Sequence, residues 1–188
     1  MLIEELQVGN QYTNNDIRAT FRCSLQSGMN KSNTTNTLVL IINHIKSIYH
    51  DRWFDNKVHH IGKGQVGDQT MTRENKTLSE SNKNSVGLHL FEVFRTGVYI
   101  YRGQVKLYDK PYQKEQFDKN GNSRKVWVFP LEFNDNSRPI ENYEIELKDK
   151  SFEIMEDLNI SHMADSYARE LSGGQKKLLE LARSIINN

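Results

Sequence analysis

The sequence is poor in cysteine, in proline and in long apolar runs. Its 188 residues include a single cysteine, Cys23, which excludes an internal disulfide framework and a cysteine-based zinc site. The longest apolar run, Leu38–Ile42, is far too short to span a membrane. The N-terminus carries Glu4 and Glu5 and lacks the apolar segment of a signal peptide. We therefore expect a soluble, cytoplasmic protein without a membrane partner.

An excess of charge of either sign is also missing. The chain has 25 basic and 24 acidic residues, a net charge of +1, which argues against a strongly basic nucleic-acid binder. However, residues 1–134 hold 18 basic and 13 acidic side chains, whereas residues 135–188 hold 7 and 11. A body of net charge +5 thus precedes a tail of net charge −4. The near-neutral total is no argument against DNA binding by the body.

The pattern of residues 1–134 predicts an α+β, mainly β domain. Runs of β-branched, aliphatic and aromatic residues predict strands, and no alternation of strands with long helices is present. The expected strands are Thr37–Ile42, Val86–Phe94, Tyr99–Leu107 and Lys125–Phe133, the last two paired as a long hairpin across the polar stretch Tyr108–Ser123. The expected helices are Asp16–Cys23, capped by Asn14 or Asn15, and Thr72–Ser81.

The composition changes after residue 134. Residues 135–150 are polar and include Pro139, which predicts a linker. In residues 151–188 apolar side chains fall at helical spacing, which predicts a helical tail. The expected organisation is therefore a domain over residues 1–134, a linker and a tail.

Three glycines, Gly62, Gly64 and Gly67, match the spacing G-x-G-x-x-G. A dinucleotide-binding loop requires an apolar helix after the glycines, and the polar stretch Asp68–Asn75 does not supply one. A P-loop requires Lys and Ser or Thr where Asp68–Gln69 stands. Two interpretations remain: an ordinary β-turn, or a tight loop that a ligand approaches closely because glycine lacks a Cβ atom.

The residues around these glycines favour a flat, hydrogen-bonding ligand. Aromatic or imidazole faces are available at Tyr49, Trp53 and His60. Carboxylate and amide groups are available at Asp51, Asp68, Gln69 and Asn75. An aromatic wall with a few such groups suits a nucleobase better than a bare phosphate.

The ordered set of motifs resembles the SRA-like (SET-and-RING-associated) domain of McrA-type HNH restriction endonucleases over about residues 6–133. The matching segments are Val8–Tyr12 with Asp16–Ile17, Ser27–Met29, Leu38–Ile42, Tyr49–Trp53, His60–Gln69, Asn75 with Leu78, Leu90–Glu92, Tyr101–Gly103 and Asp118–Arg124 running into Phe129–Leu131.

The resemblance implies a curved, barrel-like β-fold related to PUA modules, which reads DNA modification by flipping a modified cytosine into a pocket. On this interpretation Tyr49 or Trp53 stacks on the base, and Asp51 accepts a hydrogen bond from the cytosine amino group. Gly62, Gly64 and Gly67 let the backbone line the pocket near the C5 substituent, and Asp68, Gln69 and Asn75 complete the base-binding set.

The chain departs from the SRA pattern at His60–Ile61, where many such loops have Tyr–Thr before the first glycine. A preference for 5-methylcytosine therefore does not follow from the resemblance. His60 either stacks on the base in place of the tyrosine or is a solvated histidine at the end of a strand.

Basic residues near the expected pocket are candidates for phosphate contacts, which DNA binding also requires. They are Lys57, Lys63, Arg73, Lys76, Arg124 and Lys125. The alternative is that they form an ordinary solvated face. The modest charge of the body predicts weak non-specific binding that salt removes.

The tail carries a second resemblance. Leu171–Arg183, which reads LSGGQKKLLELAR, is similar to the signature segment of ABC transporter ATPases. No P-loop lysine and no Walker carboxylate accompany it, so we expect no ATP hydrolysis. A chance helix–Gly-Gly–helix segment is the alternative.

No catalytic centre is apparent, and we expect neither a metal ion nor another cofactor. His59–His60 lacks the partners of an HNH site. The leading hypothesis is a non-enzymatic module that recognises a modified base in double-stranded DNA. It is either a stand-alone reader or the specificity part of a restriction system with a separate nuclease subunit. The alternative is an interaction protein whose ABC-like tail associates with an intact ATPase subunit. Hydrolysis of nucleic acid at an unrecognised site is a third, weaker possibility.

Overall fold

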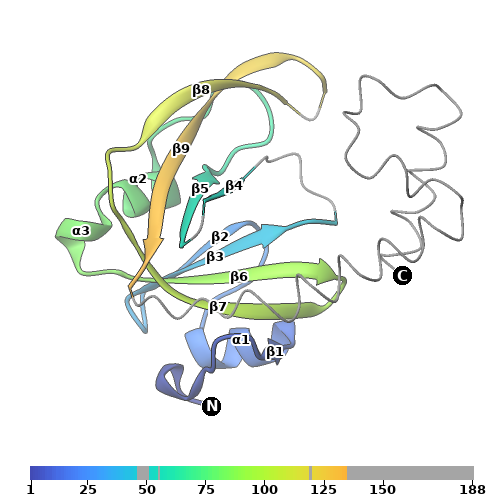
Figure 1. Cartoon of the computed structure of the whole chain (residues 1–188), viewed down its shortest axis with the longest axis vertical. Coiled ribbons are helices and arrows are strands. Elements are labelled where there is room, and N and C mark those ends of the chain that lie inside the picture. The colour runs from blue at the N-terminus through green and yellow to red at the C-terminus, as the bar shows by residue number, and fades with distance from the viewer. Residues whose placement is uncertain (46–50, 55, 119, 135–188) are drawn as a thin grey trace, which may run out of the picture. The chain divides into compact units, whose positions relative to one another are not determined.

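The computed structural model describes residues 1–45, 51–54, 56–118 and 120–134 (Figure 1). The expected linker and helical tail, residues 135–188, lie outside these ranges, as does Tyr49. The side chain of Trp53 is likewise not described. The fold is therefore that of the part of the chain for which the SRA resemblance was found.

A single curled sheet forms the body of this part (Figure 1). The strands run in the order β2-β3-β6-β7-β9-β5-β4, with β1 paired to β7 and β8 paired to β9. Among the described pairings only β3 with β6 is parallel. The bounds are β1 Gln11–Tyr12, β2 Met29–Ser32, β3 Thr37–Asn43, β4 Arg52–Phe54, β5 Lys57–Ile61, β6 Gly87–Arg95, β7 Val98–Leu107, β8 Tyr112–Phe117 and β9 Ser123–Phe133. The expected mainly β, barrel-like fold is confirmed.

The helices are short. A 3-10 turn spans Ile3–Glu5, and the α-helices are α1 Asn14–Phe21, α2 Arg73–Ser79 and α3 Ser81–Asn84. The expected capping of α1 by Asn14 or Asn15 is wrong. Thr13 caps it instead, because the Thr13 hydroxyl accepts from the Asp16 amide while the Asp16 carboxylate accepts from the Thr13 amide at 2.8 Å. Of the helices that the structure describes, none has the length and apolar character of a membrane span.

The expected long hairpin is only partly correct. β7 pairs with β9 over Val105–Leu107 and Leu131–Phe133, as predicted. The intervening polar stretch is not a loop, because it contains β8, which pairs with residues 123–128 of β9. The sequence pattern missed β8 because none of its side chains is buried, so its residues lack the apolar alternation of a half-buried strand.

The two faces of the sheet pack separate apolar clusters. Leu40, Leu90 and Phe129 belong to the larger cluster, which fills the inside of the curl. Their strand neighbours Val39 and Phe91 point to the opposite face and pack there with Phe21 of α1. This alternation is what a strand dictates. Because of this alternation, the end of β5 can carry polar side chains beside the apolar core.

Polar pairs tie the central strands together inside the protein. Glu92 of β6 and Arg102 of β7, each 1% exposed, form a buried ion pair. His89 lies 2.9 Å from the Tyr101 hydroxyl through Nδ1. Burial lowers the pKa of His89 to about 4, so its imidazole is neutral at pH 7. These groups stabilise the sheet and do not border the cavity that follows.

Candidate functional site

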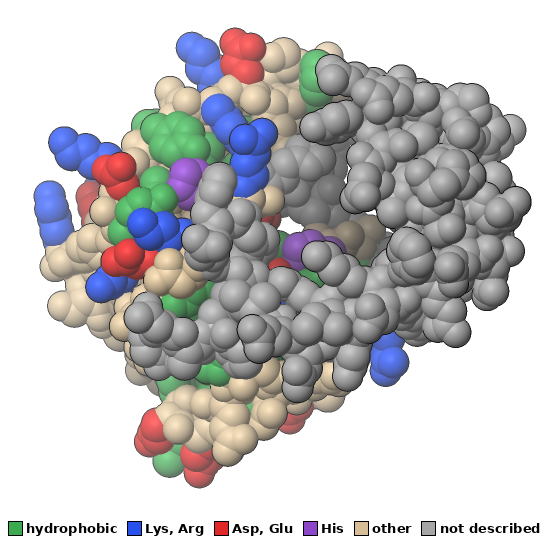
Figure 2. All heavy atoms as spheres, viewed as in Figure 1, with side chains coloured by type: hydrophobic (Ala, Val, Ile, Leu, Met, Phe, Trp, Pro, Cys, Tyr) green, Lys and Arg blue, Asp and Glu red, His purple; other side chains and the backbone are tan. Residues whose placement is uncertain are grey.

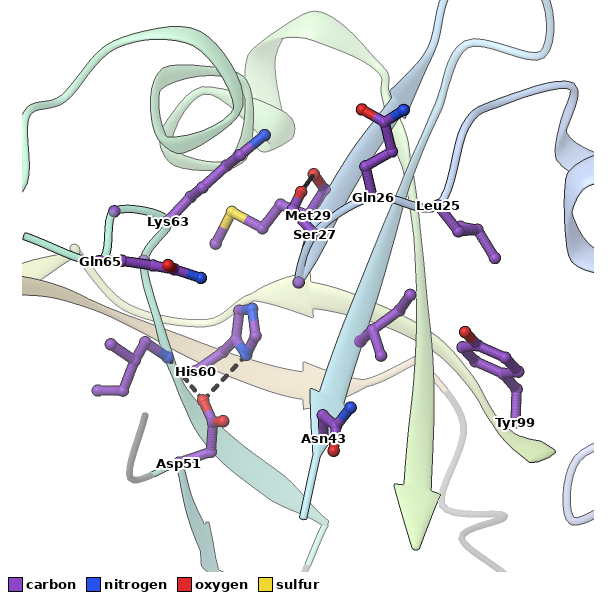
Figure 3. A pocket seen from close by; sticks show the side chains of 15 residues that line it. Leu25, Gln26, Ser27, Met29, Asn43, Asp51, His60, Lys63, Gln65 and Tyr99 are labelled. Atoms are coloured by element: carbon purple, nitrogen blue, oxygen red, sulfur yellow. Dashed lines mark hydrogen bonds and ion pairs between the residues drawn. The ribbon is translucent and has the colours of Figure 1, made fainter. Parts of the chain in front are cut away.

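A cavity of about 440 Å³ lies between the glycine loop that follows β5 and the segment that leads into β2 (Figure 3). Its size is in the range of pockets that hold small molecules. Its lining residues come from five separate parts of the chain. They are Leu25, Gln26, Ser27, Gly28, Met29, Ile41, Asn43, Asp51, His60, Ile61, Gly62, Lys63, Gly64, Gln65 and Tyr99.

Asp51 and His60 form a buried polar pair in the wall of this cavity. The Asp51 side chain is 5% exposed and that of His60 is 3% exposed. Asp51 Oδ1 accepts a hydrogen bond from the Ile61 amide at 2.7 Å and lies 3.0 Å from His60 Nδ1, as Figure 3 shows. The contact with His60 is electrostatic rather than a well-aligned hydrogen bond. The alternative of a solvated strand-end histidine is therefore wrong.

The second ring nitrogen of His60, Nε2, is unpaired within the described part of the chain. Nε2 is buried, and no described residue offers it a hydrogen bond. Figure 3 shows the ring between the Asp51 carboxylate and the side chains of Met29 and Ser27. A buried, unpaired nitrogen in a cavity wall is a group that a ligand can satisfy.

Gln69 holds the glycine loop from behind. Its Nε2 donates to the carbonyls of Gly62 and Gly64, and its Oε1 accepts from the Trp127 amide of β9 at 2.9 Å. Both ends of the amide are thus occupied, and the residue is 5% exposed. Its hydrogen bonds go to the loop and to β9 in this structure, and the predicted contact of Gln69 with a base stays a prediction.

Asn75 has the same role from α2. Its Oδ1 accepts from the Lys63 amide at 2.8 Å, and its Nδ2 donates to the carbonyls of Lys63 and Thr70. It is 3% exposed and does not line the cavity. Asn75 therefore holds the loop in this structure, and its predicted contact with a base stays a prediction.

Arg124 of β9 is buried as well, with 3% exposure. Its Nη1 donates to the Gly64 carbonyl at 2.6 Å. The guanidinium is therefore enclosed beneath the loop in this structure, and its predicted phosphate contact stays a prediction. Arg124 supplies positive charge beneath the loop.

Gly62 is required by this bracing. A Cβ atom there would lie 2.7 Å from Gln69 Oε1 and 3.0 Å from Asn75 Oδ1. Gly64 has a φ of +134°, a conformation that other residues rarely adopt. The loop is therefore a specific, close-packed structure. The expectation of a tight loop next to a ligand site is the one that the geometry supports.

The opposite wall consists of residues 25–29, of which Ser27–Met29 was part of the family resemblance without a predicted role. Asn30, 6% exposed, organises it: Oδ1 accepts from the Gln26 and Ser27 amides at 3.0 and 3.2 Å, and Nδ2 donates to the Ser27 carbonyl. An Asn three residues after Ser27 is a local turn pattern that sequence reasoning can use. Asn43 and Tyr99 also line the cavity, and no short-range signal pointed to them.

The remaining predicted residues lie at different distances from the cavity. Lys63 lines it, with Nζ 2.9 Å from Glu74 Oε1. Asp68 is exposed, accepts from the Lys125 amide and does not line it. Gly67 is exposed and also outside the lining. The side chains of three predicted phosphate-contacting residues are exposed: Arg73, Lys76 and Lys125.

A second polar cluster occupies the other face of β5. His59 Nε2 lies 2.6 Å from the Tyr108 hydroxyl and Nδ1 lies 3.1 Å from the Tyr112 hydroxyl. Lys57 Nζ stands 4.4 Å above the Tyr108 ring. Burial and the nearby Lys114 lower the pKa of His59. Because neighbouring strand residues face opposite sides, this cluster is separate from the pocket that His60 borders.

Basic side chains lie on the surface over β8, β9 and the short helices, interspersed with acidic ones (Figure 2). Within the described residues, no three His, Cys, Asp or Glu side chains come together as a metal site would require.

Two known transport ATP-binding proteins match a short part of this chain. Over 45 residues the chain is 49% identical to a probable branched-chain amino acid transport ATP-binding protein, LivG, from Methanocaldococcus jannaschii, and equally so to that of Archaeoglobus fulgidus. The match covers 24% of this chain and spans only 18% of those relatives. The ABC resemblance is thus confirmed as a small partial similarity.

Solved structures share the fold. The sulfur binding domain and SRA domain of ScoMcrA complexed with phosphorothioated DNA gives a TM-score of 0.57 at 14% identity, covering 76% of this chain and 44% of that one. KRYPTONITE in complex with mCHG DNA and SAH gives 0.55 at 14% identity, covering 74% and 34%. The SUVH5 SRA domain with fully methylated CG DNA gives 0.53 at 17% identity, covering 73% and 94%. At such identities the similarity establishes the fold alone.

Residues 8–151 match the family described as ScoMcrA-like, SRA domain. This range includes every residue that lines the cavity, together with Gln69, Asn75 and Arg124, which hold its loop. The chain belongs to the ScoMcrA-like SRA domain family.

Proposed function

We propose that this domain recognises a modified base in double-stranded DNA, and that the base is a modified cytosine flipped into the cavity between the glycine loop and residues 25–29. The solved structures of the same fold that were compared include complexes with methylated and with phosphorothioated DNA. Flipping costs a few kcal/mol of lost stacking and pairing, which contacts in the pocket must offset.

The observation that carries the proposal is the buried carboxylate of Asp51 in the cavity wall. The Ile61 amide fixes its orientation through Oδ1. A carboxylate accepts hydrogen bonds only, which suits the amino group of cytosine and excludes the O4 atom of thymine. Asp51 is therefore the residue that selects cytosine, and Tyr49 or Trp53 is the proposed stacking partner.

DNA backbone contacts are proposed for the accessible cations only. Lys63 at the cavity, together with Arg73, Lys76 and Lys125, would neutralise phosphates on the loop side. Lys57 faces the tyrosine cluster on the other side of β5 and is a weaker candidate. With so few contacts, non-specific affinity should be modest, so a moderate rise in salt should be enough to remove it.

In this proposal the domain is a reader without a catalytic centre of its own, acting in the cytoplasm as the specificity part of a restriction system. The nuclease would be a separate subunit. Residues 1–134 form the reader, residues 135–150 a linker and residues 151–188 a helical tail.

The test is a fluorescence anisotropy titration at about 50 mM salt with duplexes that carry cytosine or a modified cytosine at one position. We expect tighter binding of a modified duplex, and Asp51→Ala should abolish that difference while non-specific binding stays nearly intact. Asp68→Ala, which removes an exposed carboxylate that does not line the cavity, is the matched control and should keep the difference. Equal, purely salt-dependent affinity for all duplexes would refute the proposal.

The short similarity to transport ATP-binding proteins favours one second candidate, association of the tail with an intact ATPase subunit. Deletion of residues 135–188 separates the two. The reader proposal requires that discrimination between duplexes survives the deletion. The second candidate requires loss of a co-purifying ATPase partner.

A further inference from the structure

We propose that His60 makes the pocket select 5-hydroxymethylcytosine over 5-methylcytosine, by accepting a hydrogen bond from the hydroxyl of the 5-substituent. This inference rests on the proposed function, because it requires that a flipped cytosine occupies the cavity. It concerns only the group at C5.

The position of the His60 proton follows from its neighbour. Nδ1 lies 3.0 Å from Asp51 Oδ1, an atom that offers lone pairs only. If Nδ1 were unprotonated, two sets of lone pairs would face each other at that distance. A neutral imidazole carries one proton, so a proton on Nδ1 leaves Nε2 as an acceptor.

This acceptor has no partner among the residues that the structure describes. Nε2 is buried, and none of the described residues donates to it. A buried acceptor that stays unsatisfied costs stability, and a ligand that brings a donor recovers that cost. The side chains drawn near the ring in Figure 3, Met29 and Ser27, do not supply the donor: Ser27 Oγ donates to the Met29 carbonyl at 2.7 Å.

The pair therefore presents two adjacent acceptors, a carboxylate and an imidazole nitrogen. 5-Hydroxymethylcytosine presents two adjacent donors, the amino group on C4 and the hydroxyl on the C5 substituent. 5-Methylcytosine has the first donor and lacks the second, so it would cover Nε2 with a methyl group and leave it unpaired. The complementarity is with the hydroxymethyl base.

5-Formylcytosine is the sharpest probe of this assignment. It is similar in size to the hydroxymethyl base, but its substituent is an acceptor. A His60 protonated on both nitrogens would donate from Nε2 and would prefer the formyl base. The ranking of these two bases thus reports which way the hydrogen bond at Nε2 runs.

The experiment titrates the full chain with four duplexes that differ only at one base: cytosine, 5-methylcytosine, 5-hydroxymethylcytosine and 5-formylcytosine. We expect the hydroxymethyl duplex to bind about tenfold tighter than the methyl and formyl duplexes. Methyl binding equal to or tighter than hydroxymethyl, with cytosine rejected, overturns this inference but leaves the proposed function standing. A preference for the formyl duplex overturns the acceptor role. Equal binding of all four refutes the proposed function itself.

Two variants locate the effect. His60→Phe keeps a flat ring and removes the acceptor, so it should bring the hydroxymethyl and methyl duplexes to equal affinity. His59→Phe changes the preceding residue of β5, whose side chain lies on the opposite face. It should keep the tenfold preference for the hydroxymethyl duplex. An unchanged preference in His60→Phe would contradict the assignment. Because the ranking of the four bases is measured on the unaltered chain, the inference remains testable if His60→Phe does not fold.

Discussion

The two walls of the cavity have similar local structures, but the residues that hold them lie at different distances along the chain. Each is an irregular segment organised by buried amide side chains. Asn30 holds residues 26–29, which lie within four positions of it along the chain. The glycine loop depends on Gln69 and Asn75, and on Arg124, which lies 60 residues from Gly64. One wall is thus specified locally, and the other takes its shape from the assembled fold.

This difference bears on specificity. The long-range wall carries the loop next to Asp51 and His60, the groups proposed to contact the base. The loop is held by amide side chains and by the Arg124 guanidinium before any ligand binds. Little conformational entropy should therefore be lost on binding. The local wall completes the cavity but brings no charged side chain to it. Substitutions in the two walls should therefore differ in cost and in consequence.

The largest effect is expected for Asn75→Leu. It leaves the Lys63 amide and the carbonyls of Lys63 and Thr70 without their partner. Loss of about 3 kcal/mol of unfolding free energy should follow, measured by urea denaturation, together with loss of modified-base preference. Thr77→Val, at a partly buried position on the same helix, is the control. Unchanged stability would mean that the loop does not depend on α2.

Gly62→Ala and Gly28→Ala add the same methyl group to each of the two walls, so their costs in stability can be compared directly. The added methyl group at position 62 meets Gln69 Oε1 at 2.7 Å, whereas at position 28 the nearest atom is the Ile41 carbonyl oxygen at 3.4 Å. Gly62→Ala should cost about 2 kcal/mol and Gly28→Ala well under about 1 kcal/mol in thermal unfolding. Equal costs would remove the distinction between the walls.

Asn30→Ala should have a smaller effect than Asn75→Leu or Gly62→Ala. It releases the Gln26 and Ser27 amides and the Ser27 carbonyl, which are only partly buried, so water can replace the lost bonds. We expect a loss of about 1 kcal/mol and weaker binding with the ranking of bases preserved. A loss of ranking in duplex titrations would show that the local wall also reads the base.

The sequence predicted the fold and several residues that line the cavity, but not the role of the buried residues that hold the glycine loop. Asp51, His60, Gly62 and Gly64 were predicted at the cavity because they belong to one short, ordered motif, and they do line it. Arg124 was predicted to contact phosphate because it is a basic residue near the expected pocket. Its burial depends on a loop far away in the chain, which no local pattern contains.

The same limit explains Gln69 and Asn75. A polar side chain beside a glycine loop can point into a pocket or behind the loop, and sequence spacing does not distinguish the two. The carbonyls of Gly62 and Lys63 require hydrogen-bond donors on the side of the loop away from the cavity. Gln69 and Asn75 supply these donors and therefore lie behind the loop. β8 was missed for a different reason, since a strand with no buried side chain leaves no periodic trace.

The distance between the glycine loop and Arg124 also sets the order in which the cavity matures during synthesis. A ribosome adds about 5–20 residues per second, so Arg124 and the Trp127 amide follow the loop by several seconds. The wall around Asn30 can close as soon as it leaves the ribosome. The loop beside His60 cannot reach its final conformation until β9 has been synthesised. Before that point only one wall of the cavity can be complete.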